Sequence, residues 1–411
     1  MAARGPREFF AVRPVSEALS EFRPARRTEG ERVALDAALG RVPAEAILAR
    51  EALPGFTRAT VDGYAVRASD TYGASEGLPA YLNLTGEAVM GEAPGLDVGP
   101  GAAVAIATGA PLPAGADAVV MAEHSQAATA ELIEVLRPAA PGDGVVLGGE
   151  DAPPGAELVP TGRPLRAQDI GMLAAAGVTE LSVHSRPRVT IVSTGDELVP
   201  PSTARLATGR VRDAVAPALA ALTRQAGGSA IFGGIVPDDR AALSEALARA
   251  LPQSDVLAVS AGSSVGARDE TAAAIAALGE PGIWCHGLSL KPGKPTLLAD
   301  AGGVPVIGLP GNPRSALVVF RLLGMPIVRW VGGWLDAPAE ATTRARLDRH
   351  LPSAAGRLDI VQVSVRDGLA VPLFGSSSLL SVMTRADGFL TVPEPATGLA
   401  AGSEVEVTLY G

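Results

Sequence analysis

The sequence holds one unusual pair of cations. Lys291 and Lys294 lie three residues apart in the segment Lys-Pro-Gly-Lys-Pro, and they are the only lysines among the 34 basic residues. An ammonium is a compact point charge, whereas a guanidinium is planar and forked, so the two are not interchangeable where one of them performs chemistry. The pair therefore indicates a site for an anion that needs an ammonium, with chance survival in an arginine-biased composition as the alternative.

A turn with two adjacent carboxylates follows an apolar run. Residues 193–198 read Ser-Thr-Gly-Asp-Glu-Leu, which puts Asp196 and Glu197 directly after a glycine. Mg²⁺ binds through a few carboxylates together with waters and phosphate oxygens. The turn fits such an ion, and it also fits a solvated turn that ends a strand.

Two further segments combine small or rigid residues with the start of a helix. Residues 260–266 read Ser-Ala-Gly-Ser-Ser-Val-Gly and precede Asp269, so free backbone N–H groups and hydroxyls could hold an anion and Asp269 could bring a cation to it. Residues 308–313 read Gly-Leu-Pro-Gly-Asn-Pro, in which Asn312 suits an N-cap and Pro313 the first helical position. Together with the lysines, these segments predict a metal-assisted reaction on a phosphorylated ligand.

Alternating β and α patterns place these segments at one edge of a sheet. Residues 188–193, 230–236, 256–260 and 304–308 are predicted strands, and 211–226, 239–250, 269–278 and 313–328 are predicted helices. This alternation is typical of a doubly wound α/β domain, with a parallel sheet covered by helices on both faces. Ligands of such sheets bind at the carboxyl ends of the strands.

The flanking regions are predicted to be rich in β-structure. After a short helix at 15–22, residues 31–182 break into brief strands with many Pro-Gly turns, and 138–155 reads as a loop or crossover. Short strands at 358–365, 370–373, 388–392 and 404–409 predict a small all-β domain at the end.

Composition excludes several classes of protein. A chain of 411 residues with 47% hydrophobic and 19% charged residues is folded and has several domains. The net charge of −10 and 4% aromatic residues argue against nucleic acid as a partner. A single cysteine, Cys285, predicts a cytoplasmic protein without disulfides, and we expect neither a signal peptide nor a membrane span. Four histidines that lie far apart in the sequence disfavour a zinc site.

Read in order, seven segments resemble the MoeA family of molybdopterin molybdenumtransferases, whose eukaryotic relatives include a domain of gephyrin. They are 62–66 (Asp-Gly-Tyr-Ala-Val), 108–111 (Thr-Gly-Ala-Pro), 149–151 (Gly-Glu-Asp), 193–198, 260–269, 291–295 and 308–313. The resemblance implies an elongated four-domain subunit, usually a homodimer with the active-site cleft between subunits. The implied domains are a linker and dimerisation domain (1–50 and 147–182), an inserted β-rich domain (51–146), a molybdopterin-binding α/β domain like those of MogA and MoaB (183–335), and a C-terminal β-barrel (336–411).

The resemblance also implies a reaction, in which molybdate is inserted into adenylated molybdopterin with release of AMP and with Mg²⁺ as cofactor. A molybdopterin adenylyltransferase could deliver the substrate. The implied catalytic residues are Asp62, Thr108, Glu123, Glu197, Asp238, Asp269, Lys291 and Lys294, of which Glu197, Asp238 and Asp269 would hold the metal and Asp62, Thr108 and Glu123 would come from the partner subunit. The implied substrate-binding residues are Thr194, Gly195, Ser260, Gly262, Ser263, Ser264, Gly266, Pro310, Gly311, Asn312, Ser376 and Ser378.

The chain departs from the family pattern at several positions. Ala261 stands at a usual glycine, and the asparagine expected near Arg212-Asp213-Ala214 is absent. Ala272 replaces a common lysine, and Asp387 replaces an asparagine. The segment 57–59 (Thr-Arg-Ala) lacks the usual acid and serine. These departures leave open a sensor or scaffold that binds molybdopterin or molybdate without turnover. The resemblance of the α/β unit to MogA and MoaB leaves open an adenylyltransferase-like activity.

Overall fold

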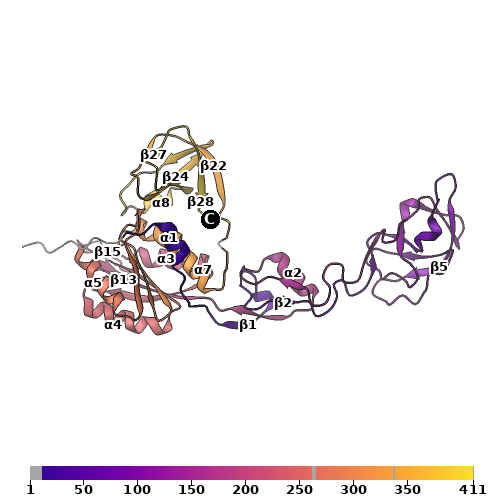
Figure 1. Cartoon of the computed structure of the whole chain (residues 1–411), viewed down its shortest axis with the longest axis horizontal. Coiled ribbons are helices and arrows are strands. Elements are labelled where there is room, and N and C mark those ends of the chain that lie inside the picture. The colour runs from indigo at the N-terminus through magenta and orange to yellow at the C-terminus, as the bar shows by residue number, and fades with distance from the viewer. Residues whose placement is uncertain (1–11, 262–264, 337, 411) are drawn as a thin grey trace, which may run out of the picture.

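The computed structural model describes residues 12–261, 265–336 and 338–410 (Figure 1). The subunit is elongated, as the resemblance implied. One end is a β-rich unit that carries β5 (Ala80–Ala88), and the middle is a small unit with β1 (Gly30–Ala34) and α2 (Ala167–Ala175). The opposite end holds an α/β unit with a barrel beside it. The predicted combination of α/β and β-rich domains is confirmed.

The α/β unit is built on a six-stranded sheet of order β16-β13-β17-β21-β20-β18. Its four parallel strands confirm the predicted ones: β13 (Arg188–Thr194), β16 (Ser229–Val236), β17 (Val256–Ser260) and β21 (Val304–Leu309). The sequence patterns did not reveal two strands, β18 (Pro281–His286) and β20 (Leu297–Ala301), which extend the sheet in antiparallel fashion. The sheet is therefore mixed rather than purely parallel, because the short turn at Gly302 and Gly303 returns the chain directly into β21.

Helices cover both faces of this sheet. On one face Leu219, Val319 and Phe320 are fully buried between the sheet and the helices α1, α3, α6 and α7, and on the other Leu247 and Ile275 belong to α4 and α5. The helices are α1 (Val15–Glu21), α3 (Val215–Gln225), α4 (Arg240–Ala250), α5 (Val265–Ala276), α6 (Pro313–Val319) and α7 (Met325–Val331), with 3₁₀ turn η4 (Leu251–Gln253) after α4.

Three predicted helix boundaries are wrong. The helix expected from residue 211 begins at Val215, because β15 (Val211–Arg212) pairs with β14 (Leu198–Val199). The helix expected from residue 269 begins at residue 265. The helix expected over 313–328 continues to Val331 and is interrupted by a π-turn, η5 (Phe320–Gly324).

The C-terminal strands close into a barrel. In the order β24-β25-β22-β28-β26, the last strand pairs again with the first, so no edge is left among these five. One strand of the α/β unit, β19 (Leu290–Lys291), adds to β24 in parallel. The barrel strands are β22 (Thr342–Leu347), β24 (Leu358–Arg366), β25 (Leu369–Pro372), β26 (Gly388–Val392) and β28 (Glu404–Leu409), accompanied by β23 (Leu351–Pro352), β27 (Gly398–Leu399) and α8 (Ser381–Thr384).

The N-terminal half of the chain extends from the α/β unit through the middle unit to the far unit and then returns through the middle unit (Figure 1). In the middle unit β1 pairs with β12 (Glu180–His184), and β2 (Ile47–Leu48) pairs with β11 (Glu157–Val159), so two separated segments build it together with η1 (Leu35–Ala37). The far unit contains a six-stranded sheet of order β7-β4-β6-β5-β9-β8. Its elements are β3 (Arg58–Ala59), β4 (Gly63–Val66), η2 (Ala68–Thr71), β6 (Ala102–Ile106), β7 (Ala118–Met121), η3 (Ala122–His124), β8 (Ser125–Ala127), β9 (Leu132–Val135) and β10 (Val145–Val146).

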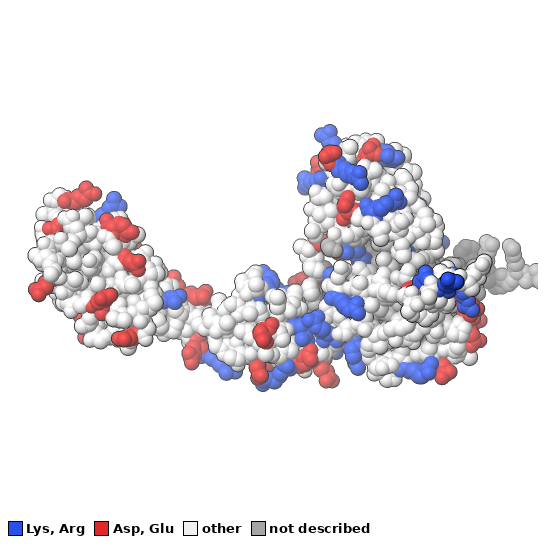
Figure 2. All heavy atoms as spheres, turned by 180° about the vertical axis from the view of Figure 1, so that it is seen from behind, with Lys and Arg blue, Asp and Glu red and all other residues white. Residues whose placement is uncertain are grey.

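Charge is distributed unevenly along the subunit. Residues 51–146 contain twelve acidic side chains and three arginines, a net charge of −9 in a chain whose net charge is −10. On the face shown in Figure 2 the far unit carries mostly acidic side chains, while lysine and arginine gather on the α/β unit and the barrel. Among the described residues, no helix is both long and apolar enough to cross a membrane.

Candidate active site

Three predicted loops meet at one edge of the α/β sheet. Ser193 lies beside Ser260 in the register of β13 and β17, and Ser260 lies beside Leu309 in the register of β17 and β21. The amide of Ala261 donates to the Leu309 carbonyl at 3.1 Å, so the chains leave these strands side by side. The structure thus brings together predicted residues that follow the three strands: Thr194, Gly195, Ser260, Pro310, Gly311 and Asn312. Gly262, Ser263 and Ser264 lie outside the described residues, and Gly266 belongs to the first turn of α5.

An acidic cluster occupies the start of this edge. The Gly195 amide donates to the Val236 carbonyl at 3.1 Å, and the Asp238 amide donates to the Asp196 carboxylate at 3.3 Å, which draws the ends of β13 and β16 together. Glu197 folds back over Gly195, where a Cβ would lie 2.7 Å from its carboxylate oxygen and where φ is +153°. Only glycine fits this position without displacing Glu197.

The pKa of Asp238 is raised above its usual range. Loss of solvation is the largest cause, the charges of Glu197 and Asp196 add to it, and the Thr194 hydroxyl opposes it. Desolvation and the neighbouring negative charges both penalise the charged carboxylate. A cation placed among these groups would relieve the repulsion, so the cluster has the charge character of a cation site.

The metal ligands implied by the resemblance are not preassembled. Asp269 is exposed on α5, and no group of three acidic, histidine or cysteine side chains within the described part of the chain is arranged to hold an ion. Mg²⁺ commonly keeps several waters and takes only one or two carboxylates plus substrate phosphates. The carboxylates of Glu197, Asp238 and Asp269 are the right donor type for such an ion, with the remaining ligands supplied by water and substrate.

The lysine pair lines a cleft of about 850 Å³ between the α/β unit and the barrel. The Lys291 ammonium lies 3.6 Å from the Asp359 carboxylate, and 58% of its side chain is exposed. Asp359 is buried and also accepts a hydrogen bond from Arg357 at 2.8 Å. The charged residues that line the cleft are Lys291, Lys294, Arg314, Arg357 and Asp359. Four cations against one carboxylate leave the cleft strongly positive, as an anion site requires.

Loops from both units complete the cleft. Pro310 and Asn312 line it from the α/β side, and Ser377 lines it from the barrel. The predicted Ser376 and Ser378 are exposed beside it, with their hydroxyl oxygens 3.0 Å apart. Pro313 is the first residue of α6, as predicted, but the Asn312 side chain makes no capping bond, so the predicted capping role is wrong. Asn312 instead lines the cleft, where its amide group can face a ligand.

Sequence reasoning missed two arginines of this cleft, Arg314 and Arg357. The sequence contains a weak indication for Arg314. A cation in the first turn of a helix lies at the positive end of the helix dipole, where it lowers stability, so its presence there indicates another role. For Arg357 the sequence offers only its position one residue before β24. Both are brought to the lysines by the packing of the barrel, which no local pattern predicts.

Two departures from the family pattern have structural roles here. Asp213 accepts a hydrogen bond from the Ser193 hydroxyl at 2.7 Å and two from the amides of Val215 and Ala216, so it caps α3 and ties it to β13. Asp387 accepts from the Val365 amide at 2.7 Å in the barrel. At both positions an aspartate carboxylate oxygen accepts hydrogen bonds that the amide oxygen of an asparagine could also accept.

The third predicted group lies in the far unit. The Asp62 carboxylate accepts from the amide and the hydroxyl of Thr108 at 2.7 and 2.9 Å, and these bonds, the amide first, hold the pKa of Asp62 below its usual range. The Ala122 amide donates to the Asp62 carbonyl at 3.0 Å, which brings the neighbouring Glu123 to the same place. A Cβ on Gly63 would lie 1.9 Å from the Val120 carbonyl oxygen, so glycine is required beside Asp62.

Within one subunit, this group does not meet the lysine cleft. Asp62, Thr108 and Glu123 are exposed on the far unit, whereas the cleft lies at the opposite end of the molecule (Figure 1). The two halves of the predicted site are therefore separate in a single subunit of this structure.

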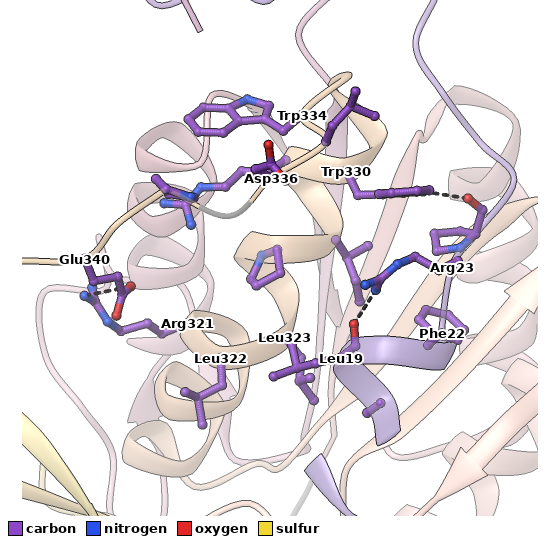
Figure 3. A pocket seen from close by; sticks show the side chains of 17 residues that line it. Leu19, Phe22, Arg23, Arg321, Leu322, Leu323, Trp330, Trp334, Asp336 and Glu340 are labelled. Carbon is purple, nitrogen blue, oxygen red and sulfur yellow. Dashed lines mark hydrogen bonds and ion pairs between the residues drawn. The ribbon is translucent and has the colours of Figure 1, made fainter. Parts of the chain in front are cut away.

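A second hollow, of about 330 Å³, lies between α1, α7 and the segment that leads into the barrel (Figure 3). Leu19, Leu323 and Trp330 form apolar parts of its wall. Arg23 donates to the Leu19 carbonyl, and Arg321 is paired with Glu340 at 3.3 Å. None of the predicted site residues lines this hollow, whereas Lys291, Lys294, Pro310 and Asn312 line the cleft.

Comparisons with known proteins agree with the geometry. Family models match in three consecutive parts: "MoeA N-terminal region (domain I and II)" over residues 13–177, "Probable molybdopterin binding domain" over 190–330 and "MoeA C-terminal region (domain IV)" over 344–410. The chain is 33% identical to a molybdopterin molybdenumtransferase of Nostoc sp., covering 92% of this chain and 88% of that protein. It is 33% identical to molybdopterin molybdenumtransferase 2 of Mycobacterium tuberculosis, covering 91% and 94%. A crystal structure of the molybdopterin biosynthesis moeA protein from Pyrococcus horikoshii is similar over 97% of this chain and 100% of that one, with a TM-score of 0.84 and 31% identity.

Proposed function

Since this chain belongs to the MoeA family of molybdopterin molybdenumtransferases and is a transferase of molybdenum cofactor biosynthesis, we propose that it inserts molybdate into adenylated molybdopterin and releases AMP. The observation that carries the proposal is the positive cleft that contains both lysines of the chain. Both substrates are anions, and in a protein with a net charge of −10 they need such a local concentration of cations.

The charge of each side chain in the site indicates whether it would bind an anion or a cation. Lys291, Lys294 and Arg357 would hold oxyanions in the cleft and stabilise charge that develops on oxygen during transfer. The backbone groups after β13, β17 and β21, with the side chains of Thr194, Ser260 and Asn312, would hold the substrate at the strand ends. Glu197, Asp238 and Asp269 would hold Mg²⁺, which when bound offsets negative charge on phosphate oxygens.

We also propose that the enzyme is a cytoplasmic homodimer that receives its substrate from a molybdopterin adenylyltransferase. The separation of Asp62, Thr108 and Glu123 from the cleft supports the dimer, as does the contrast between an acidic far unit and a cationic cleft. The division into 1–50 with 147–182, 51–146, 183–335 and 336–411 is part of the same proposal.

A single-turnover experiment tests this function. Adenylated molybdopterin, molybdate and Mg²⁺ are mixed with excess enzyme, and AMP release is followed together with metal bound to the pterin. We expect AMP to appear only when molybdate is present, in step with captured metal. Intact adenylated ligand that stays bound to the enzyme would favour the sensor or scaffold instead, and AMP release without metal capture would contradict insertion.

Asp269→Asn tests the metal role. The substitution removes a charge from an exposed side chain and keeps its shape, so we expect the fold to be unaffected and the half-saturating Mg²⁺ concentration to rise about tenfold, roughly 1.4 kcal/mol. Titration of AMP release with Mg²⁺ measures it. Glu245→Gln, an exposed carboxylate on α4 away from this acidic cluster, is the control. An unaltered Mg²⁺ dependence in Asp269→Asn would remove that role.

A further inference from the structure

The barrel is joined to the α/β unit by one covalent connection with a hollow beside it. The segment from Gly332 to Ala341 leads from α7 to β22, and the 330 Å³ hollow lies along it (Figure 3). Its contacts with Gly162 and Arg321 lie outside the lysine cleft, so they do not set the position of the barrel loops that line the cleft.

Strand pairing provides a first attachment between the two units. β19 runs parallel to the start of β24, with Leu290 beside Leu358 and Lys291 beside Asp359. The Leu358 amide donates to the Ser289 carbonyl at 2.8 Å. This attachment is short, because β19 has only two residues.

Arg314 provides a second attachment elsewhere in the cleft lining. Its backbone amide donates to the Ser377 carbonyl at 3.1 Å, and its guanidinium Nη1 donates to the Gly375 carbonyl at 2.8 Å. One residue at the start of α6 thus holds two carbonyls of a single barrel loop. That loop, residues 375–378, also carries Ser376 and Ser378.

The burial of Arg314 is costly for stability. The residue is 9% exposed, burial lowers the pKa of its guanidinium, and its Nε atom has no hydrogen-bond partner among the described residues. Within that same part of the chain no carboxylate forms an ion pair with it, since the one acid of the cleft, Asp359, pairs with Lys291 and Arg357. A buried cation with incomplete hydrogen bonding is a poor way to gain stability alone.

We propose that Arg314 is a positioning residue that fixes the barrel loop 375–378 against the α/β unit and thereby sets the width of the lysine cleft. Away from the cleft the barrel is also held by Arg321, which donates to the Leu409 carbonyl at 3.2 Å, and by Phe389, which is buried in the core of the α/β unit. Arg314 therefore fixes the position of the loop at the cleft rather than that of the whole barrel. Ser377 and the lysines then keep one separation before substrate arrives, which lowers the entropy lost on binding. The role in catalysis rests on the proposed function, but the positioning itself does not.

Kinetics test the catalytic consequence. Arg314→Met keeps the length of the side chain and removes its donors, and we expect the KM for molybdate to rise at least tenfold while kcat at saturation changes less than twofold. Arg314→Lys should give an intermediate KM, because an ammonium can still donate to the Gly375 carbonyl. Arg349→Met, an exposed barrel arginine outside the cleft, is the control. A fall in kcat that follows the loss of folded protein, with KM unchanged, would overturn the proposal.

A distance measurement tests the positioning without any turnover. Spin labels are placed on the exposed positions Ala241→Cys in α4 and Leu379→Cys directly after the barrel loop, and the native Cys285 is buried and does not compete for label. We expect a narrow distance distribution with Arg314 and a clearly broader one in Arg314→Met. Equal widths would overturn the proposal even if the enzyme is active, and a broadening would support it even if AMP release fails.

Discussion

Lys291→Arg should lower kcat/KM for molybdate insertion about a hundredfold, roughly 2.7 kcal/mol of transition-state stabilisation, without loss of folded protein. The Lys291 side chain is 58% exposed in the cleft, so the larger guanidinium has room and the fold should tolerate it. We expect activity to fall because the guanidinium at position 291 would direct its charge toward Asp359 and away from the substrate. Single-turnover AMP release and a thermal unfolding curve measure the two quantities separately.

The neighbouring Asp359 is the reason why we expect an arginine at position 291 to be less active than the lysine. At 3.6 Å from Nζ, its carboxylate holds the ammonium only loosely, since Arg357 already donates to it at 2.8 Å. A guanidinium at position 291 would pair with that carboxylate through two parallel bonds, which are stronger and more rigid. The charge would then be directed away from the substrate oxyanion.

The chain offers a matched control for this substitution. Arg349→Lys makes the reverse exchange at an exposed barrel position outside the cleft and should leave kcat/KM within twofold of the unmodified enzyme. Undiminished turnover in Lys291→Arg would show that any cation suffices, and the rarity of lysine in this sequence would then be a matter of composition.

The sheet edge could be predicted from sequence because its cause is local. Each parallel strand is a short apolar run followed by a turn, and the carboxyl ends of parallel strands must share an edge. The sequence alone therefore suffices to place Thr194, Ser260 and Asn312 at neighbouring strand ends. The antiparallel strands β18 and β20 were missed because they are joined through the Lys-Pro-Gly-Lys-Pro segment, which carries no helix to reveal an α/β alternation.

The cleft itself could not be predicted in this way. Arg314 and Arg357 reach the lysines only because the barrel closes and then docks through β19, and both events depend on contacts between distant segments. The resemblance supplied Ser376 and Ser378 for this loop, whereas Ser377 lines the cleft. Local sequence patterns predict helices and strands and where they end. How two units dock depends on packing between segments that are distant in the sequence.

A mixed dimer should show whether the active site is shared between subunits. Asp62→Asn and Lys291→Met should each abolish most activity in homodimers, because one breaks the far-unit group and the other the cleft. A heterodimer of the two, purified through two different tags, should recover about half of the unmodified activity, since a two-fold axis brings one intact cleft to one intact far unit. AMP release per dimer measures it.

The reciprocal heterodimer makes the test decisive. Pairing the unmodified chain with the double variant Asp62→Asn, Lys291→Met leaves every shared site with one broken half, so its activity should stay near that of the single variants. Sites contained within one chain would invert both results, with no recovery in the first heterodimer and half activity in the second. Because Asp62 is exposed and Asn keeps the oxygen that accepts from Thr108, the far unit should remain folded in either case, and a loss of activity will report the missing charge. A chain that stays monomeric would contradict the shared site outright, since the far unit and the α/β unit lie at opposite ends of the subunit (Figure 1).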